Sequence, residues 1–356
     1  MISRTNTTLS KQKSLFSKKY FTLALAPMAG YTNLPFRRLI RSLGGVDLTF
    51  TELVNARSLI ENKKEALQLS SLSQDDMPCG IQLFGGVINE MIEAAKILES
   101  QGASLIDINM GCPAPKVLKG GGGSALLKEP FFAIQMAEAL VKSVSIPITI
   151  KTRLGFDSEH IIAPMLAHAF QESGIQAITI HGRTREQGFS GTVNLEIIQQ
   201  VVEAAPKIPI FGNGDITTVK NALIMKNKTG CSGLSIGRGA LYNPWIFNQI
   251  KSSSAHSSPP SFEDRLQWME NHLKALIEYY GETSACCQFR KIAPFYTRRM
   301  GPSREVNRAL SQCSSFAQYL EIIENYKGKR ILFLDENGEL KPTYYPQPVH
   351  SSLDFY

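Results

Sequence analysis

The sequence predicts an α/β protein, a (β/α)8 TIM barrel followed by a small C-terminal helical domain. From residue 23 onward, short β-rich runs alternate with segments of helical period, which is the pattern of strand–helix units around a parallel sheet. Eight such units take up about 230 residues, close to the usual length of these barrels. A doubly wound sheet is the structural alternative. Its first strand is normally followed by a G-x-G-x-x-G turn, whereas this chain has Ala26-Pro-Met-Ala-Gly30.

Eight candidate strands stand out as short runs rich in apolar and β-branched residues. They are Leu23–Ala26, Leu48–Glu52, Gly80–Leu83, Leu105–Asn109, Ile148–Lys151, Ala177–His181, Ile210–Gly212 and Gly233–Ile236. Segments with apolar side chains at helical spacing lie between them. The clearest are Asn89–Ser100, Phe131–Val144, Ile161–Ser173, Leu195–Ala204 and Val219–Lys226. We therefore expect the barrel to span residues 21–251.

A serine- and proline-rich segment, residues 252–261, follows the eighth unit and marks a linker, because it is too polar to bury a core. Beyond it, Leu266, Met269, Leu273 and Leu276 recur at helical spacing, and a helical domain is predicted over residues 262–330. Residues 331–356 form a tail with aromatic residues and prolines but little periodicity. The sequence assigns this tail no function.

The composition excludes several classes of protein. The chain has 356 residues, of which 43% are hydrophobic and 19% charged, so disorder over the whole chain is excluded. The longest apolar runs, such as Ile146–Ile150, are far shorter than the roughly 18 residues of a membrane-spanning helix. The six cysteines include no C-x-x-C pair, so neither a metal site nor a disulfide scaffold is predicted. A reducing cytoplasm fits this pattern.

The positive charge is concentrated in two places. Lys and Arg outnumber Asp and Glu by 38 to 31, a net charge of +7. Residues 1–20 contain five basic residues and no acid, and residues 290–308 contain six basic residues and one acid. Such clusters favour an extended polyanion over a small acidic metabolite, with an ordinary solvated surface as the alternative. Residues 1–20 lack the cleavage site of a targeting peptide, so we expect a disordered basic extension.

Polar residues stand at six of the eight predicted strand ends, where a barrel of this kind gathers its working groups. Buried Lys, Arg and His need partners, so the pattern predicts a ligand with many polar edges. The turns Gly212-Asn-Gly-Asp215 and Gly237-Arg-Gly239 lie where such barrels commonly bind phosphate, although either alone also fits an ordinary turn. Lys151 could direct a positive charge at a cofactor or substrate, or be an ion-paired lysine.

Cys112 lies just after the fourth predicted strand, in Asn109-Met-Gly-Cys-Pro113. An isolated cysteine is more often a small buried apolar residue than a reactive one. Its position at a strand end favours a chemical role, because an ordinary cysteine thiol is mostly protonated at pH 7 and can serve as a general acid or a nucleophile. The other five cysteines have no such setting and are interpreted as structural.

Five motifs taken together resemble the tRNA-dihydrouridine synthases, with the bacterial B-type the most similar. The motifs are Ala26-Pro-Met-Ala-Gly-Tyr-Thr-Asn-Leu-Pro-Phe-Arg37, Ile106-Asp-Ile-Asn-Met-Gly-Cys-Pro113, Ala177-Ile-Thr-Ile-His-Gly-Arg-Thr184, Gly212-Asn-Gly-Asp-Ile216 and Ile236-Gly-Arg-Gly239. The similarity runs from about Leu23 to Ile250, and Phe289-Arg-Lys291 resembles a segment of that family's helical domain. The resemblance implies an FMN-dependent barrel with a helical RNA-binding domain that reduces specific uridines in tRNA with NADPH.

The resemblance also implies roles for individual residues. Those implied to hold the cofactor are Pro27, Met28, Ala29, Gln82, Lys151, His181, Asn213, Gly214, Asp215, Gly237 and Arg238. Those implied to contact the substrate are Asn109, Arg153, Arg290, Lys291, Arg298 and Arg299. In the implied reaction NADPH reduces FMN, the flavin passes hydride from N5 to uracil C6, and Cys112 donates a proton to C5. The base must leave the RNA stack first.

Two other functions remain open from the residues alone. One is a dihydroorotate-type flavin enzyme acting on a free pyrimidine, and the other is a non-catalytic RNA-binding barrel protein. The basic segment 290–308 argues against the first, since a free base needs no basic platform. The chain departs from the family pattern at Asn33, where Asp is usual, and in Gly120–Gly123, whose glycines would make the Cys112 loop mobile. We expect a cytoplasmic monomer that binds tRNA, with no membrane or metal partner.

Overall fold

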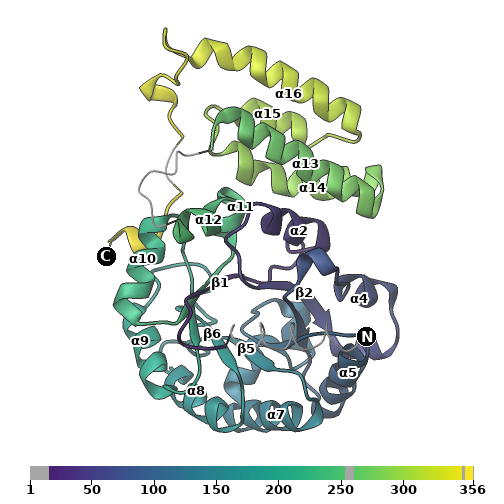
Figure 1. Ribbon diagram of the computed structural model, residues 1–356, viewed down its shortest axis with the longest axis vertical. Coiled ribbons are helices and arrows are strands. Elements are labelled where there is room, and N and C mark those ends of the chain that lie inside the picture. Colours follow the sequence, from purple (N-terminus) through teal and green to yellow (C-terminus); the bar gives the residue numbers. More distant parts are fainter. Residues whose placement is uncertain (1–15, 253–259, 347–348, 356) are drawn as a thin grey trace.

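The protein consists of a strand–helix barrel with a helical domain packed on one end (Figure 1). The structure is a computed structural model, and it describes residues 16–252, 260–346 and 349–355. Most of the predicted linker, residues 253–259, and most of the predicted N-terminal extension, residues 1–15, lie outside the described residues.

Eight parallel strands form the wall of the barrel in the order β1-β8-β7-β6-β5-β4-β3-β2. They are β1 Thr22–Leu25, β2 Thr49–Asn55, β3 Cys79–Phe84, β4 Ile106–Met110, β5 Ile148–Arg153, β6 Ala177–His181, β7 Ile210–Asn213 and β8 Gly233–Ile236. A parallel bridge between Ala24 and Leu48 joins the two ends of the sheet, with the Leu25 N–H donating to the Leu48 carbonyl at 2.9 Å. The predicted barrel fold is confirmed, and every predicted strand overlaps an observed one.

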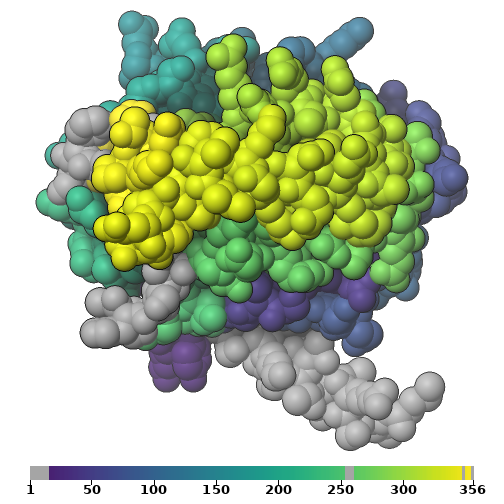
Figure 2. Space-filling view, turned by 90° about the horizontal axis from the view of Figure 1, so that it is seen from above, coloured from purple at the N-terminus to yellow at the C-terminus, as the bar shows by residue number. Residues whose placement is uncertain are grey.

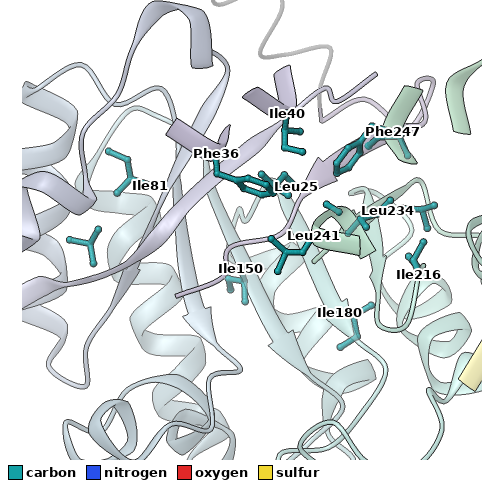
Figure 3. Packing of buried hydrophobic residues seen from close by; sticks show 14 of the residues in the cluster. Leu25, Phe36, Ile40, Ile81, Ile150, Ile180, Ile216, Leu234, Leu241 and Phe247 are labelled. Atoms are coloured by element: carbon teal, nitrogen blue, oxygen red, sulfur yellow. The ribbon is translucent and has the colours of Figure 1, made fainter. Parts of the chain in front are cut away.

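Helices connect the strands and cover the outside of the barrel. They are α2 Leu34–Ser42, α3 Ala56–Ile60, α4 Lys64–Leu69, α5 Ile88–Ser100, α6 Pro115–Lys119, α7 Pro130–Ser143, α8 Ala163–Glu172, α9 Leu195–Ala204, α10 Val219–Thr229, α11 Arg238–Tyr242 and α12 Ile246–Lys251. Residues such as Ile150, Ile180 and Leu234 point outward from the strands into one large apolar core (Figure 3). Successive side chains of a strand face opposite ways, so their neighbours point into the barrel.

The interior of the barrel is layered along its axis. A second apolar cluster fills the end where the strands begin, and it consists of Ala24, Leu48, Phe50, Leu105, Ala177 and Phe211. Phe16, within the predicted extension, packs against this cluster from outside. Asp107 lies two residues beyond Leu105 on β4 and is in register with Thr149 of β5, and both are buried polar residues. Nearer the strand ends, Asn109 of β4 is in register with Lys151 of β5, and His181 of β6 is in register with Asn213 of β7, so the polar residues of the predicted site lie close together.

The helical domain contains α13 Phe262–Tyr280, α14 Glu282–Thr297, α15 Arg304–Leu310 and α16 Phe316–Arg330. Ser261 and Asp264 form a reciprocal capping box that starts α13. α13 packs on α2, and α14 packs on α11. Aromatic rings fill this junction, with Trp268 of α13 lying 5.7 Å from Trp245 and 6.4 Å from Phe36, between ring centroids. The domain therefore sits over the end of the barrel at which the strands finish.

The tail after α16 does not continue the helical pattern. It makes short 3-10 turns at Ile331–Phe333 and Pro342–Tyr344, and its last turn, η5 Ser352–Phe355, packs beside α10. Figure 1 shows the yellow C-terminal end of the chain beside the barrel. Figure 2, seen from above, shows the yellow and green C-terminal segments spread across the face that the helical domain covers. The tail thus returns to the barrel after passing the helical domain.

Candidate active site

A cavity of about 410 Å³ opens where the barrel strands end, which is large enough for a ligand of cofactor size. It brings together most of the residues predicted from the strand ends. The predicted residues that line it are Pro27, Met28, Ala29, Asn109, Cys112, Lys151, Arg153, His181, Asn213, Gly214, Asp215, Gly237 and Arg238. Gln82, Arg290, Lys291, Arg298 and Arg299 are not among the lining residues.

Cys112 is half-buried in a loop that backbone hydrogen bonds hold in place. The Cys112 N–H donates to Oδ1 of Asn109 at 2.9 Å, and the Cys112 carbonyl accepts from the N–H and hydroxyl of Ser124 at 3.0 and 3.1 Å. Asn109 is itself fixed, because its Nδ2 donates to Oε1 of Gln82 at 2.8 Å. None of these bonds uses the thiol, which is left available for chemistry at the cavity wall.

Gln82 lies behind Asn109 in the polar layer of the barrel interior. Its Nε2 donates to Oδ2 of Asp107 at 2.6 Å, while the Thr149 hydroxyl donates to Oδ1 of the same carboxyl group, also at 2.6 Å. Burial raises the pKa of Asp107 to about 6. Gln82 therefore supports Asn109 from beneath, and its contact with the cofactor stays a prediction.

Lys151 and His181 are polar groups with strongly altered acidity. Burial, and then repulsion from Arg153, lowers the pKa of Lys151 to about 8, and its Nζ donates to Oδ1 of Asn213 at 3.2 Å. Burial, followed by the positive charges of Arg153 and Lys151, holds the pKa of His181 well below its usual 6.5. At pH 7 the cavity therefore contains a charged lysine beside a neutral imidazole.

Arg153 supports the Cys112 loop and the loop after β6 together. Its Nε donates to the Gly111 carbonyl at 2.8 Å, and its guanidinium also donates to the carbonyls of Thr184 and Gly188 at 2.9 and 2.8 Å. Burial and the nearby Arg183 lower the pKa of Arg153 to about 10, so it stays charged at neutral pH. It contributes positive charge next to Cys112 and also fixes the shape of the cavity.

The two glycine-rich turns form the other end of the cavity. Gly214 has φ +123°, and a Cβ there would lie 2.8 Å from Val193 and 3.0 Å from His181, so only glycine fits. Asp215 follows with φ 53°, and its carboxylate accepts two hydrogen bonds from the buried Arg183 at 2.6 and 3.1 Å. Arg238 lies 3.5 Å from the same carboxylate and is half-exposed. Asp215 therefore orients Arg183 and Arg238 beside this turn.

Several lining residues were not predicted as site residues. Phe189 lies at the mouth between two cations, with its ring 5.6 Å from the Arg153 guanidinium and 4.6 Å from that of Arg238. Phe295 of α14 forms the wall contributed by the helical domain, 5.0 Å from the Tyr242 ring and 5.7 Å from the Tyr31 ring. Others are Leu53, Thr217, Ser235, Val349 and His350. They come from segments that have no motif in the sequence.

The basic residues on α13, on α14 and directly after α14 fall into two groups. Arg298 lies 5.8 Å from the centre of the Tyr242 ring, at the rim of the cavity. Burial, and then repulsion from Arg298, lowers the pKa of Arg299. Arg265 of α13 joins them, and burial followed by repulsion from Arg299 lowers its pKa to about 10. Within the described part of the chain, these three residues, the arginine cluster, form no ion pair with a carboxylate. The cluster is suited to binding a polyanion.

The other two residues predicted to contact tRNA, Arg290 and Lys291, make contacts within the protein. Arg290 donates from Nε to the Cys313 carbonyl at 2.9 Å, which ties α14 to the loop before α16. Lys291 places its Nζ 5.5 Å from the centre of the Tyr31 ring, at the edge of the cavity. Arg290 therefore supports the helical domain, and Lys291 lies between the two domains.

The two departures from the family pattern have structural explanations. Asn33 caps α2, with its Oδ1 accepting from the Phe36 N–H at 3.0 Å, a role that Asp also fills at this position. The glycine run allows close packing, since a Cβ on Gly123 would lie 2.6 Å from the Cys112 carbonyl and one on Gly122 3.1 Å from Gly85. The predicted mobility of this loop is therefore opposed by packing that only glycine permits.

Neither a metal centre nor a membrane-spanning helix emerges from the described ranges. Among residues 16–252, 260–346 and 349–355, no three His, Cys, Asp or Glu side chains are grouped so that they could hold a metal ion. No helix in those ranges is long and apolar enough to cross a membrane.

Comparison with known proteins identifies the family. The dihydrouridine synthase family matches residues 24–330. A Rickettsia bellii protein named "Probable tRNA-dihydrouridine synthase" is 40% identical over 293 residues, 81% of this chain and 89% of its own. The tRNA-dihydrouridine synthase B of Pasteurella multocida is 34% identical over 323 residues, 90% of this chain and 96% of its own. A solved structure of nitroalkane oxidase from Streptomyces ansochromogenes aligns with a TM-score of only 0.39 and 14% identity, over 64% of this chain and 67% of that one. The chain therefore belongs to the dihydrouridine synthases, a family of oxidoreductases.

Proposed function

We propose that this protein reduces uridine in tRNA to 5,6-dihydrouridine, with FMN in the barrel cavity, NADPH as electron donor and Cys112 as proton donor. The observation that carries the proposal is a single cavity that contains Cys112, the cationic Lys151 and Arg153, and the glycine turn at Gly214. The family assignment gives the reaction class, and the named relatives are synthases that act on tRNA.

The residues of the cavity suit FMN. Ser235 lines the cavity, and its buried hydroxyl has no hydrogen-bond partner within the described residues, so a polar ligand would satisfy it. Gly214 and Gly237 line the cavity and would let phosphate oxygens approach their backbone N–H groups, and Arg238 would add a positive charge. Lys151 and Pro27 to Ala29 would hold the ring end. Cationic side chains outnumber the one carboxylate in the lining, and Arg183 already neutralises that carboxylate.

Reduction of the uracil C5=C6 bond needs a hydride and a proton. FMN, kept reduced by NADPH, would supply the hydride when bound. Cys112 would donate its Sγ proton to C5, and the half-buried position of the loop lets solvent return that proton. Asn109 and Arg153 hold the adjacent residues Cys112 and Gly111, and this would fix the thiol against the base. His181 is neutral at pH 7, which suits hydrogen bonding to the base rather than donation of a proton from an imidazolium.

The helical domain would bind the tRNA backbone next to the cavity. Phe295 of α14 lines the cavity, and Arg298, the residue directly after α14, lies over Tyr242 at the rim. A base entering the cavity would therefore leave its phosphates near the arginine cluster. Phosphate contacts would position the RNA, while the cavity would select the base.

Incubation of the purified protein with NADPH and an unmodified tRNA transcript tests the proposal. We expect the protein to be yellow, with the absorbance of a flavin, and to form dihydrouridine that mass spectrometry detects in the transcript. Free uracil and orotate are the comparison substrates, and turnover of either one without turnover of tRNA would instead indicate an enzyme of free pyrimidines. A colourless protein that binds tRNA without modifying it would indicate a non-catalytic RNA-binding protein.

A further inference from the structure

The C-terminal segment 349–353 returns to the cavity, although it lies beyond the family match, which ends at residue 330. Val349 and His350 line the cavity. Leu353 is fully buried and belongs to the main apolar core of the barrel. The segment is therefore built into the end of the barrel rather than resting on its surface.

Two serines attach this segment to the phosphate end of the cavity. The Ser351 hydroxyl donates to the backbone carbonyl of Asp215 at 2.6 Å, and the Ser352 N–H donates to Oδ2 of Asp215 at 3.2 Å. The Ser352 hydroxyl accepts from the Val193 N–H at 3.0 Å. Both serines are almost completely buried, so water cannot replace these bonds readily if a serine is removed.

Asp215 needs such support. Its φ of 53° lies in the left-handed region, which few residues other than glycine adopt, and it follows Gly214 at φ +123°. Its carboxylate also orients Arg183 and Arg238. The segment thus holds both the backbone and the side chain of the residue that shapes the turn between β7 and α10.

We propose that the segment 349–353 is part of the cofactor site, with Ser351 and Ser352 as positioning residues that fix the Gly214-Asp215 turn. The fixed turn keeps its backbone N–H groups and Arg238 directed at the phosphate of the bound cofactor. This inference rests on the proposed function, because it takes FMN phosphate to be the anion at this end. The intact protein should therefore release FMN more slowly than variants in which these serine contacts are lost.

The rate of FMN release tests the inference. The FMN-loaded full-length protein is diluted, and the fluorescence of the released flavin is followed with time. We expect Ser351→Ala to release FMN about two- to tenfold faster, the effect of one lost hydrogen bond. A chain ending at Pro346 should release it on the order of tenfold faster or more, because it loses both serines. Ser311→Ala is the matched control, since that exposed hydroxyl bonds only its own helix end.

Thermal unfolding of the cofactor-free variants separates positioning from general stabilisation. We expect Ser351→Ala to unfold within a degree or two of the wild type while releasing FMN faster. Wild-type release rates in Ser351→Ala and in the shortened chain would overturn the inference, as would faster release that only follows a loss of stability. Leu353→Asp, which expels the segment at full length, replaces the shortened chain if that chain does not fold. Absence of FMN binding by the wild type would instead refute the proposed function, and this inference with it.

Discussion

Replacement of Cys112 by alanine should remove the proton donor without disturbing the loop that carries it. Every hydrogen bond given above for this residue belongs to its backbone, through Asn109 and Ser124, and these bonds survive in Cys112→Ala. The thiol is only half-buried, so its loss should lower the free energy of unfolding by about 1 kcal/mol or less. FMN binding should be retained, since the phosphate end of the cavity is unchanged.

The expected effect on catalysis is much larger. A general acid typically contributes 10²–10⁴-fold to a rate, which corresponds to roughly 3–5 kcal/mol of barrier. Reduction of the flavin by NADPH does not involve protonation of uracil and should proceed at the wild-type rate. Oxidation of the reduced flavin by tRNA should slow by about that 10²–10⁴-fold factor.

Anaerobic stopped-flow absorbance separates these two half-reactions, because the flavin bleaches in the first and regains its colour in the second. Cys287→Ala is the control, since Cys287 is an exposed cysteine on α14. Near-wild-type reoxidation by tRNA in Cys112→Ala would refute the assignment of Cys112 as the acid. Equal slowing of both half-reactions would show that the residue acts by holding the cofactor site together.

Three further outcomes follow from the charges around the cavity. Arg238→Ala should weaken FMN binding about ten- to a hundredfold, measured by fluorescence titration, because a charge-assisted contact contributes about 1.5–3 kcal/mol. Unchanged affinity in the folded variant would place the phosphate elsewhere. Lys151 is charged below its pKa of about 8 and neutral above it, so FMN affinity should fall as the pH rises through 8. The same titration on Lys151→Met should show no such step, and a persistent step would point to another group. Each phosphate contact contributes about 0.7–0.9 to the slope of log K against log salt for tRNA binding. The double variant Arg298→Ala with Arg299→Ala should therefore reduce that slope by about 1.5. A slope equal to that of the exposed-lysine control Lys96→Ala would exclude both arginines from the interface.

The barrel could be predicted because its strands are regular and its helices are long enough to show a period. The strands at Ala177–His181 and Gly233–Ile236 agree with the prediction residue for residue. Helices such as α3 and α11, with five residues each, could not be found in this way, because one turn and a half shows no periodicity. The position of such short helices is set by the loops on either side of them.

Much of the candidate site could also be predicted, because parallel strands must bring their ends to one mouth. Arg183 was visible in the His181-Gly-Arg183 strand end, but its pairing with Asp215 depends on a neighbouring loop. Phe295 gave no signal, since an aromatic residue on an amphipathic helix is normally core. The charge count in 290–308 likewise could not show that Arg290 turns inward to the Cys313 carbonyl. The direction in which a side chain points is set by packing, and a count of charges carries no information about packing.

The aromatic junction between the barrel and the helical domain also provides an intrinsic fluorescence signal. The chain has only two tryptophans. Trp245 belongs to the segment after α11 and Trp268 to α13, and their ring centroids lie 5.7 Å apart across the junction. Intrinsic fluorescence excited at the tryptophan band therefore reports almost exclusively on that seam, so separation or tightening of the two domains during tRNA binding can be followed without attaching a label.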